Sequence, residues 1–258
     1  MRLRGLILVG IFMTWAGLAF AGQTCATATV VPADGRVVDF DFVNTGTSNF
    51  YQFSVTKGHS YSVEVREDYD DPPSTLTVQV NSENATCTTA AAGGHRTEAI
   101  EPALPANSFR ESFTAAASGT DSISVNNTGA NGRYVSVSVS ETTVFNPQFS
   151  TFVSFTTQYL FINTTSTAVH GVLTLTATLC AGALPAPIVT PVIVPAGANL
   201  VLAANPNGSI PTPANCGGYA IFTHDGPPGS LLTDSLYLNP SASVIVSAKF
   251  APTRQGHN

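Results

Sequence analysis

Residues 48–65 read SNFYQFSVTKGHSYSVEV, and apolar side chains alternate in them with polar ones on both sides of a Lys57-Gly58 pair. The apolar set is Tyr51, Phe53, Val55, Tyr61, Val63 and Val65. A period of two is typical of a β-strand with one buried face, because successive side chains of a strand point to opposite faces. Gly58 favours a turn, since glycine adopts the positive φ angles that many turns need. The stretch therefore predicts two strands joined by a turn, with the aromatic rings in the core.

The same alternation continues along both halves of the chain. It recurs in residues 37–42, 75–80, 121–125 and 133–141, and again in residues 158–180, 186–203, 217–238 and 241–250. We find no comparable run with the 3.6-residue period of a helix. We predict an all-β fold of two tandem antiparallel β-sandwiches, jelly-roll or immunoglobulin-like, with no substantial helix after the first 21 residues. The expected domains are residues 22–142 and 143–251, with a disordered tail at 252–258.

The first 21 residues have the features of an export signal. Arg2 and Arg4 precede an apolar stretch at residues 6–15, and Ala19-Phe20-Ala21 matches the small-x-small pattern of a cleavage site. This arrangement predicts a secretory signal peptide cut after Ala21, with an uncleaved anchor as the alternative. No later run is long and apolar enough to suggest a membrane-spanning helix. We therefore expect a secreted, periplasmic or extracellular protein.

The cysteine count is even, which favours disulfides in an oxidising compartment. The chain has four cysteines, Cys25, Cys87, Cys180 and Cys216, and no Cys-x-x-Cys pair. Four cysteines allow three pairings. We prefer Cys25–Cys87 with Cys180–Cys216, because each bond then stays inside one half of the chain.

Charge is unevenly distributed over a chain of net charge −6. Fourteen of the sixteen acidic residues lie between the predicted cleavage site and Glu141, so the first half is acidic and the second nearly neutral. Nucleic-acid binding requires clustered Lys and Arg side chains that neutralise phosphates. This distribution excludes nucleic acid as a partner.

The first half resembles a known family. The quoted stretch 48–65, the acidic loop that follows it, and residues 119–141 (GTDSISVNNTGANGRYVSVSVSE) are similar to the bacterial pre-peptidase C-terminal domain, over about residues 24–142. That family often has Asp just before the aromatic strand, where this chain has Ser48-Asn49. The resemblance implies a non-catalytic β-sandwich that accompanies secreted enzymes, some members binding calcium or polymeric substrates. Residues 223–238 of the second half resemble an uncharacterised immunoglobulin-like module of secreted bacterial proteins.

An acidic loop follows the second of the quoted strands. It contains Glu67, Asp68, Asp70 and Asp71, whose carboxylate oxygens are the ligand type that calcium prefers, and Asp39 or Asp41 is a candidate additional ligand. The loop lacks the Asp-x-Asp-x-Asp-Gly spacing of a dedicated calcium loop. The alternative is a solvated hairpin tip. Calcium is the one cofactor that the sequence suggests.

The segment 219–235, YAIFTHDGPPGSLLTDS, contains the residue types of a hydrolase triad. His224 and Asp225 are neighbours, however, and in an extended segment neighbouring side chains point to opposite faces. The Asp-Gly-Pro-Pro-Gly run that starts at Asp225 is typical of a turn. We therefore predict a strand, a turn and a strand here, with no catalytic residue, and keep a hydrolase that uses His224 as a hypothesis to be tested.

These patterns together predict a non-catalytic protein of two β-sandwich modules that acts in extracellular binding or adhesion. Its partner would be an extracellular polymer or protein. The alternative is a calcium-dependent accessory module that binds carbohydrate or protein beside a separate secreted enzyme.

Overall fold

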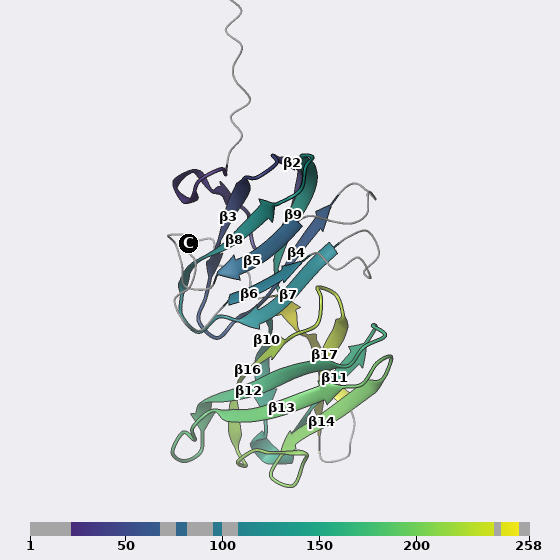
Figure 1. Ribbon diagram of the computed structural model, residues 1–258. Helices are drawn as coiled ribbons and strands as arrows, with labels where there is room; N and C mark the ends of the chain where they lie inside the picture. The colour runs from purple at the N-terminus through teal and green to yellow at the C-terminus, as the bar shows by residue number, and fades with distance from the viewer. Residues whose placement is uncertain (1–21, 68–75, 82–94, 100–107, 240–243, 253–258) are drawn as a thin grey trace, which may run out of the picture.

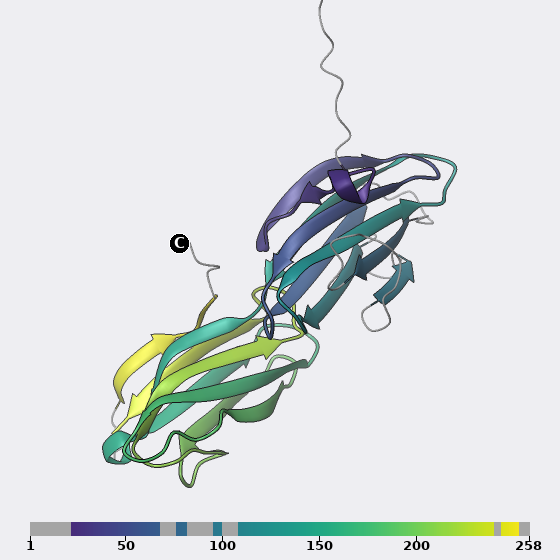
Figure 2. The ribbon, with the colours of Figure 1, turned by 90° about the vertical axis from the view of Figure 1, so that its left-hand side faces the viewer.

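The computed structural model describes residues 22–67, 76–81, 95–99, 108–239 and 244–252. The predicted signal peptide and residues 253–258 lie outside these ranges. The described chain forms four sheets that make up two β-sandwiches, one after the other along the sequence (Figures 1 and 2). Two three-residue 3₁₀ helices, η1 (Cys25–Thr27) and η2 (Phe152–Ser154), are the helices of the described residues. The prediction of an all-β fold is confirmed.

The first sandwich consists of a five-stranded and a four-stranded sheet. All strand pairs are antiparallel except β1 with β3. In spatial order the larger sheet comprises β1 (Thr29–Val30), β3 (Ser48–Val55), β8 (Gly119–Asn127), β5 (Leu76–Asn81) and β6 (His95–Ala99). The smaller comprises β2 (Asp34–Val43), β9 (Arg133–Glu141), β4 (Ser60–Glu67) and β7 (Ser108–Thr114).

The two strands of the quoted stretch belong to different sheets. β3 pairs with β8, whereas β4 pairs with β7 and β9, so the turn at Gly58 (φ +79°) carries the chain from one layer to the other. The predicted inward residues of both strands are buried and face each other across the core. The ring centroids of Phe53 and Tyr61 are 6.3 Å apart. Burial of these aromatic rings removes a large apolar area from water and holds the two layers together.

The second sandwich has two five-stranded sheets. In spatial order the first comprises β13 (Ile188–Val194), β12 (Val169–Cys180), β16 (Cys216–His224), β10 (Val144–Ser150) and β19 (Ala251–Pro252). The second comprises β15 (Ile210–Pro211), β14 (Asn199–Asn205), β11 (Thr156–Asn163), β17 (Leu231–Leu238) and β18 (Val244–Lys249). Between the layers Phe161 of β11 meets Phe222 of β16, with ring centroids 4.7 Å apart. The core therefore follows the alternation seen in the sequence.

One predicted disulfide is present in the structure. Cys180 and Cys216 lie opposite each other on β12 and β16 and are bonded, which confirms this pairing. Cys25 is also disulfide-bonded. Its predicted partner, Cys87, lies outside the described residues. In the described ranges no helix has the length and hydrophobicity to cross a membrane.

Candidate functional site

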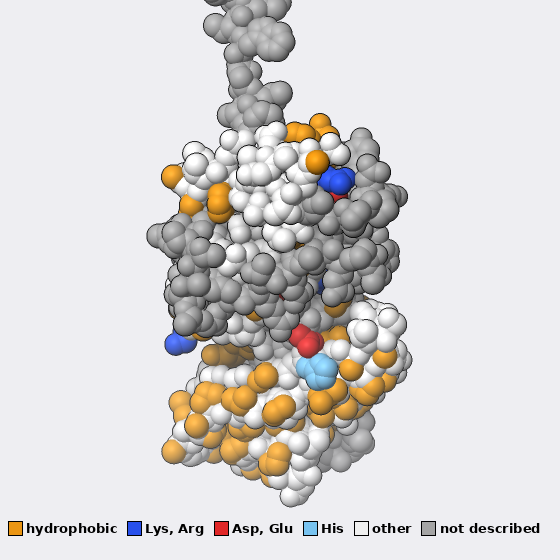
Figure 3. Space-filling view, viewed as in Figure 1, with side chains coloured by type: hydrophobic (Ala, Val, Ile, Leu, Met, Phe, Trp, Pro, Cys, Tyr) orange, Lys and Arg blue, Asp and Glu red, His pale blue; other side chains and the backbone are white. Residues whose placement is uncertain are grey.

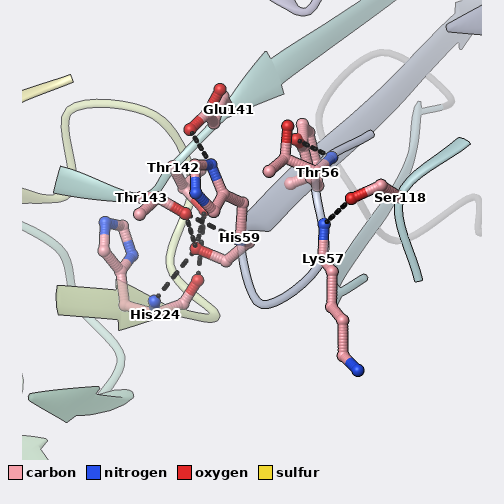
Figure 4. Close-up of polar contacts among 10 residues, drawn as sticks. Thr56, Lys57, His59, Ser118, Glu141, Thr142, Thr143 and His224 are labelled. Atoms are coloured by element: carbon pink, nitrogen blue, oxygen red, sulfur yellow. Dashed lines mark hydrogen bonds and ion pairs between the residues drawn. The ribbon is translucent and has the colours of Figure 1, made fainter. Parts of the chain in front are cut away.

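The two sandwiches meet at a small group of buried polar residues, which we call the seam: Ser60, Thr142, Thr143 and His224 (Figure 4). Ser60 begins β4, Thr142 and Thr143 connect β9 to β10, and His224 ends β16. The Ser60 hydroxyl accepts hydrogen bonds from the Thr142 hydroxyl at 2.9 Å and from the His224 main-chain N–H at 3.2 Å. The seam therefore links the main chain of the second sandwich to a side chain of the first.

Further hydrogen bonds fix the connecting segment. The Ser60 N–H donates to the Thr143 hydroxyl oxygen at 2.6 Å, and the Thr142 N–H donates to the Ser60 carbonyl at 2.8 Å. The Thr142 hydroxyl also lies 3.2 Å from the His224 carbonyl oxygen. The peptide groups on both sides of the His224 Cα are thus held by residues at the boundary between the sandwiches.

The His224 ring is buried in this junction. It is 8% exposed and packs against the Phe222 ring, with centroids 5.7 Å apart and planes 25° apart. Its Nδ1 atom is buried without a hydrogen-bond partner. Burial lowers the pKa of His224 to about 4, although the Asp225 charge and the Gly226 backbone act in the opposite direction. The imidazole is therefore neutral at neutral pH.

The turn after His224 has the predicted form. β16 ends at His224, β17 begins at Leu231, and the Ser230 N–H donates to the Pro227 carbonyl at 3.0 Å between them. The Asp225 carboxylate accepts a hydrogen bond from the main-chain N–H of His170 at 2.7 Å, and its other oxygen lies 3.2 Å from the ring Nδ1 of His170. Asp225 thus binds a histidine on another strand, and the interpretation of this stretch as strand, turn and strand is confirmed.

A second histidine lies on the first-sandwich side of the junction. The His59 Nδ1 is 2.7 Å from the Glu141 Oε1, and both side chains are largely buried, at 20% and 6% exposure (Figure 4). His59 immediately precedes Ser60, and Glu141 immediately precedes Thr142. The junction therefore contains one imidazole paired with a carboxylate and one without such a pair.

A groove of about 1350 Å³ opens beside the seam and is lined by both sandwiches. One wall is the β2-β9-β4-β7 sheet, where Glu64 lies opposite Arg110 on one side and Ser138 on the other. The facing wall comes from β11 and β17, where Ile162 lies opposite Leu232. One wall is therefore rich in hydroxyls and charges, and the other is apolar.

The charges of the polar wall are paired with one another. Glu64 binds Arg66 Nε at 2.6 Å and Arg110 Nη2 at 3.1 Å. Burial opposes ionisation of Glu64, yet the hydrogen bonds and charges of the two arginines lower its pKa below the usual value. At the rim, Arg36 Nε lies 3.3 Å from Asp34 Oδ2. The wall thus presents hydrogen-bonding groups with little net charge.

Exposed apolar side chains are common on the second sandwich, inside and outside the groove. Leu232 on the groove wall is 59% exposed, and Val189 and Ile193 on β13 are 60% and 58% exposed. Figure 3 shows apolar side chains distributed over β12, β13 and β14 of this sandwich. Large apolar surfaces on soluble proteins are often interaction sites.

The predicted calcium ligands are only partly within the described residues. Asp68, Asp70 and Asp71 lie outside them, as does the side chain of Asp39. Glu67, the last residue of β4, is buried, and its Oε1 lies 3.2 Å from Arg133 Nε of β9. In the described ranges no group of three or more His, Cys, Asp or Glu residues is arranged to hold a metal ion. The calcium site stays a prediction.

Asp41, the other candidate from β2, has a structural contact. The Tyr51 hydroxyl donates to its Oδ2 at 2.6 Å. Burial and the neighbouring Asp41 carboxylate raise the pKa of this tyrosine. The bond anchors the outer end of a core ring.

Sequence patterns do not indicate Ser60, Thr142 or Thr143 as site residues. Each has the size and polarity of an ordinary strand or loop residue, and nothing in its immediate neighbours distinguishes it. Their proximity depends on how the two sandwiches pack. The predicted domain boundary at residues 142/143 was the one available signal, since side chains at a boundary are candidates for contacts between modules.

Comparisons with known proteins give structural matches alone. No family model and no curated protein sequence matches the chain. Among solved structures, the chain is similar to the pre-peptidase C-terminal domain of a collagenase from Bacillus anthracis, with 14% identity and a TM-score of 0.33, over 43% of this chain and 93% of that one. This match belongs to the same family that residues 24–142 resemble in sequence.

Two further matches cover more of the chain. The tandem CBM22 domains at the N-terminus of a Paenibacillus barcinonensis protein match 76% of this chain and 88% of theirs, with 10% identity and a TM-score of 0.24. A β-glucuronidase from Bacteroides uniformis matches 83% of this chain and 27% of its own, with 9% identity and a TM-score of 0.18.

Proposed function

We propose that this protein is a non-catalytic binding protein of the cell exterior, and that an extracellular polymer or protein occupies the groove between its two sandwiches. The observation that carries this proposal is the groove itself, to which both sandwiches contribute a wall of different chemistry. Sites formed where two modules meet are common places for ligands, because the junction is concave.

The size and chemistry of the groove favour an extended, uncharged ligand. Its volume of about 1350 Å³ exceeds the roughly 300–1,000 Å³ of ordinary small-molecule sites. The Glu64–Arg110 pair and Ser138 offer hydrogen bonds on one side, and Ile162 and Leu232 offer apolar contact on the other. A polymer segment with a polar and an apolar edge satisfies both walls.

The environments of the histidines support a non-catalytic role. His59 and His170 are bonded to carboxylates, while the Ser60 hydroxyl is bonded to the Thr142 hydroxyl and the His224 main chain. Nucleophilic catalysis needs the hydroxyl bonded to the imidazole. Location outside the cell is supported by the Cys180–Cys216 bond, because structural disulfides persist in oxidising compartments. We further propose residues 22–142 and 143–251 as the two folding units.

Binding to insoluble polymers tests the proposal. The oxidised protein without residues 1–21 is incubated with cellulose, chitin, peptidoglycan and denatured collagen, and the protein left in solution is measured. We expect retention by at least one polymer. Failure to bind any of the four would contradict a groove specific for this class of ligand.

A matched pair of variants locates the site. Leu232 and Val189 are 59% and 60% exposed on strands of the same sandwich, but Leu232 lines the groove and Val189 lies outside its lining. We expect Leu232→Ser to weaken retention at least about 10-fold, since it removes about 1.4 kcal/mol or more of apolar contact, and Val189→Ser to leave retention unchanged. Equal losses in both variants would assign binding to the general apolar surface.

A further inference from the structure

His224 combines three features that no other residue of the seam shares. Its ring is titratable and 8% exposed, its Nδ1 is buried without a partner, and its main-chain N–H and carbonyl are bonded to Ser60 and Thr142. The ring therefore sits where a change in its charge acts directly on the contact between the two sandwiches.

We propose that His224 makes this contact acid-sensitive: protonation of its imidazole opens the seam and so changes the groove between the sandwiches. The geometry carries this inference, because a second ring proton has no acceptor at the buried Nδ1. A buried, unpaired charge is costly, whereas the opened seam exposes the ring to water. The proposal is independent of which ligand the groove binds.

The groups around the ring compensate only in part for its protonation, because burial outweighs the favourable effects of the Asp225 charge and the Gly226 backbone. From the second sandwich, Asp225 follows His224 directly, but its carboxylate is bonded to His170. From the first sandwich, the Glu141 carboxylate is bonded to His59. Asp34 lines the same groove at the rim and is paired with Arg36. Each neighbouring carboxylate therefore has another partner.

His59 is not the trigger. Its ring already has a carboxylate partner, since the His59 Nδ1 lies 2.7 Å from the Glu141 Oε1. The Nδ1 of His224, in contrast, is buried without a hydrogen-bond partner.

The size of the effect follows from linkage. The pKa of His224 is about 4 in the closed seam, against the ordinary 6.5 when the ring is in water. The open form binds protons more tightly, so its population rises as the pH falls through this interval. For these two values the opening equilibrium increases about 100-fold between about pH 7 and pH 4.

Amide hydrogen exchange measures this opening even when the open form is rare. The amides of interest are the N–H groups of Ser60 and His224, both bonded within the seam. Their protection factors, each corrected for the intrinsic exchange rate at that pH, are expected to fall about 100-fold from about pH 7 to pH 4. Amides of the core strands β3 and β11 serve as the internal reference and are expected to retain higher protection throughout.

Two variants assign the effect to one ring. His224→Phe keeps an aromatic ring and removes the titration, so its seam protection is expected to be independent of pH; His224→Gln serves the same purpose if the larger ring prevents folding. His59→Gln is the matched control and is expected to retain the pH dependence. The proposal would be overturned if seam protection in the wild type did not change with pH. It would also be overturned if the fall in seam protection persisted in the His224 variants or disappeared in His59→Gln. Seam amides with the same absolute protection as the core amides at each pH would do the same, because the seam would then exchange only by global unfolding.

Discussion

The hydroxyl of Ser60 offers the sharpest test of how the two sandwiches are joined. Replacing Ser60 with Ala removes one oxygen atom and leaves the main chain intact. The His224 N–H then loses its acceptor in a buried environment, while the Thr142 hydroxyl keeps the His224 carbonyl as an alternative acceptor at 3.2 Å. One buried donor left without a partner costs about 1–3 kcal/mol. We therefore expect Ser60→Ala to lower the free energy of unfolding by about 2 kcal/mol.

The same strand supplies a control. Ser62, two residues further along β4, is as buried as Ser60, at 2% against 1% exposure, but its hydroxyl oxygen has no hydrogen-bond partner. Ser62→Ala removes a buried hydroxyl that makes no bond. Its free energy of unfolding should therefore stay within about 0.5 kcal/mol of the wild type or rise.

Urea unfolding at pH 7, followed by far-ultraviolet circular dichroism, compares the two variants. Ser60→Ala should shift the midpoint to lower urea with an unchanged slope, since the folded and unfolded surfaces are the same. Equal destabilisation by both substitutions would refute the reasoning, because the loss would then reflect the missing hydroxyl in general and not its bonds across the seam.

Three further outcomes are expected. The folded-state pKa of His224, about 4, lies below the ordinary 6.5. The contribution of the neutral ring to the free energy of unfolding is therefore complete above about pH 6.5 and falls by about 3 kcal/mol as the pH drops to about 4. In urea titrations His224→Phe should lack this part of the loss, and a pH profile identical to that of the wild type would contradict the prediction. Replacing both Cys180 and Cys216 with Ala removes a disulfide between residues 36 positions apart, and should lower the free energy of unfolding by about 4 kcal/mol. A loss below about 1 kcal/mol would contradict this value and indicate a structured unfolded state. Glu67→Gln should destabilise the protein by about 3 kcal/mol with calcium or with chelator alike, because the buried Glu67 carboxylate pairs with the partly buried Arg133. A loss confined to the calcium-containing sample would make Glu67 a metal ligand.

Local sequence patterns predicted the strands of residues 48–65 and their buried faces correctly, but they missed β6, β7 and β10, which lie outside the alternating segments. Tyr51, Phe53 and Tyr61 are in the core because alternation at a period of two forces one set of side chains to a single face. The turn at residues 225–230 was equally predictable, since Asp, Gly and Pro restrict the backbone locally. These properties depend on neighbouring residues alone.

The pairing of strands was not available from the sequence. The alternation on both sides of Gly58 suits a hairpin within one sheet as well as a crossing between two layers, and the structure has the crossing. The choice depends on distant strands: β3 pairs with β8, some 70 residues away, and β4 with β9. The candidate site was still less predictable, because its walls come from both sandwiches.

The sequence by itself thus determined the class of fold, the inward faces of the strands around Gly58 and the Cys180–Cys216 pairing preference. Only the tertiary structure decided that Ser60 and His224, 164 positions apart, share a hydrogen bond, and that the ring of His224 is buried at the contact between the sandwiches. The physical reason is the sequence distance over which each effect acts. Periodicity and turn chemistry depend on a few neighbouring residues, whereas the burial of a ring and the position of a groove depend on how whole sheets pack together.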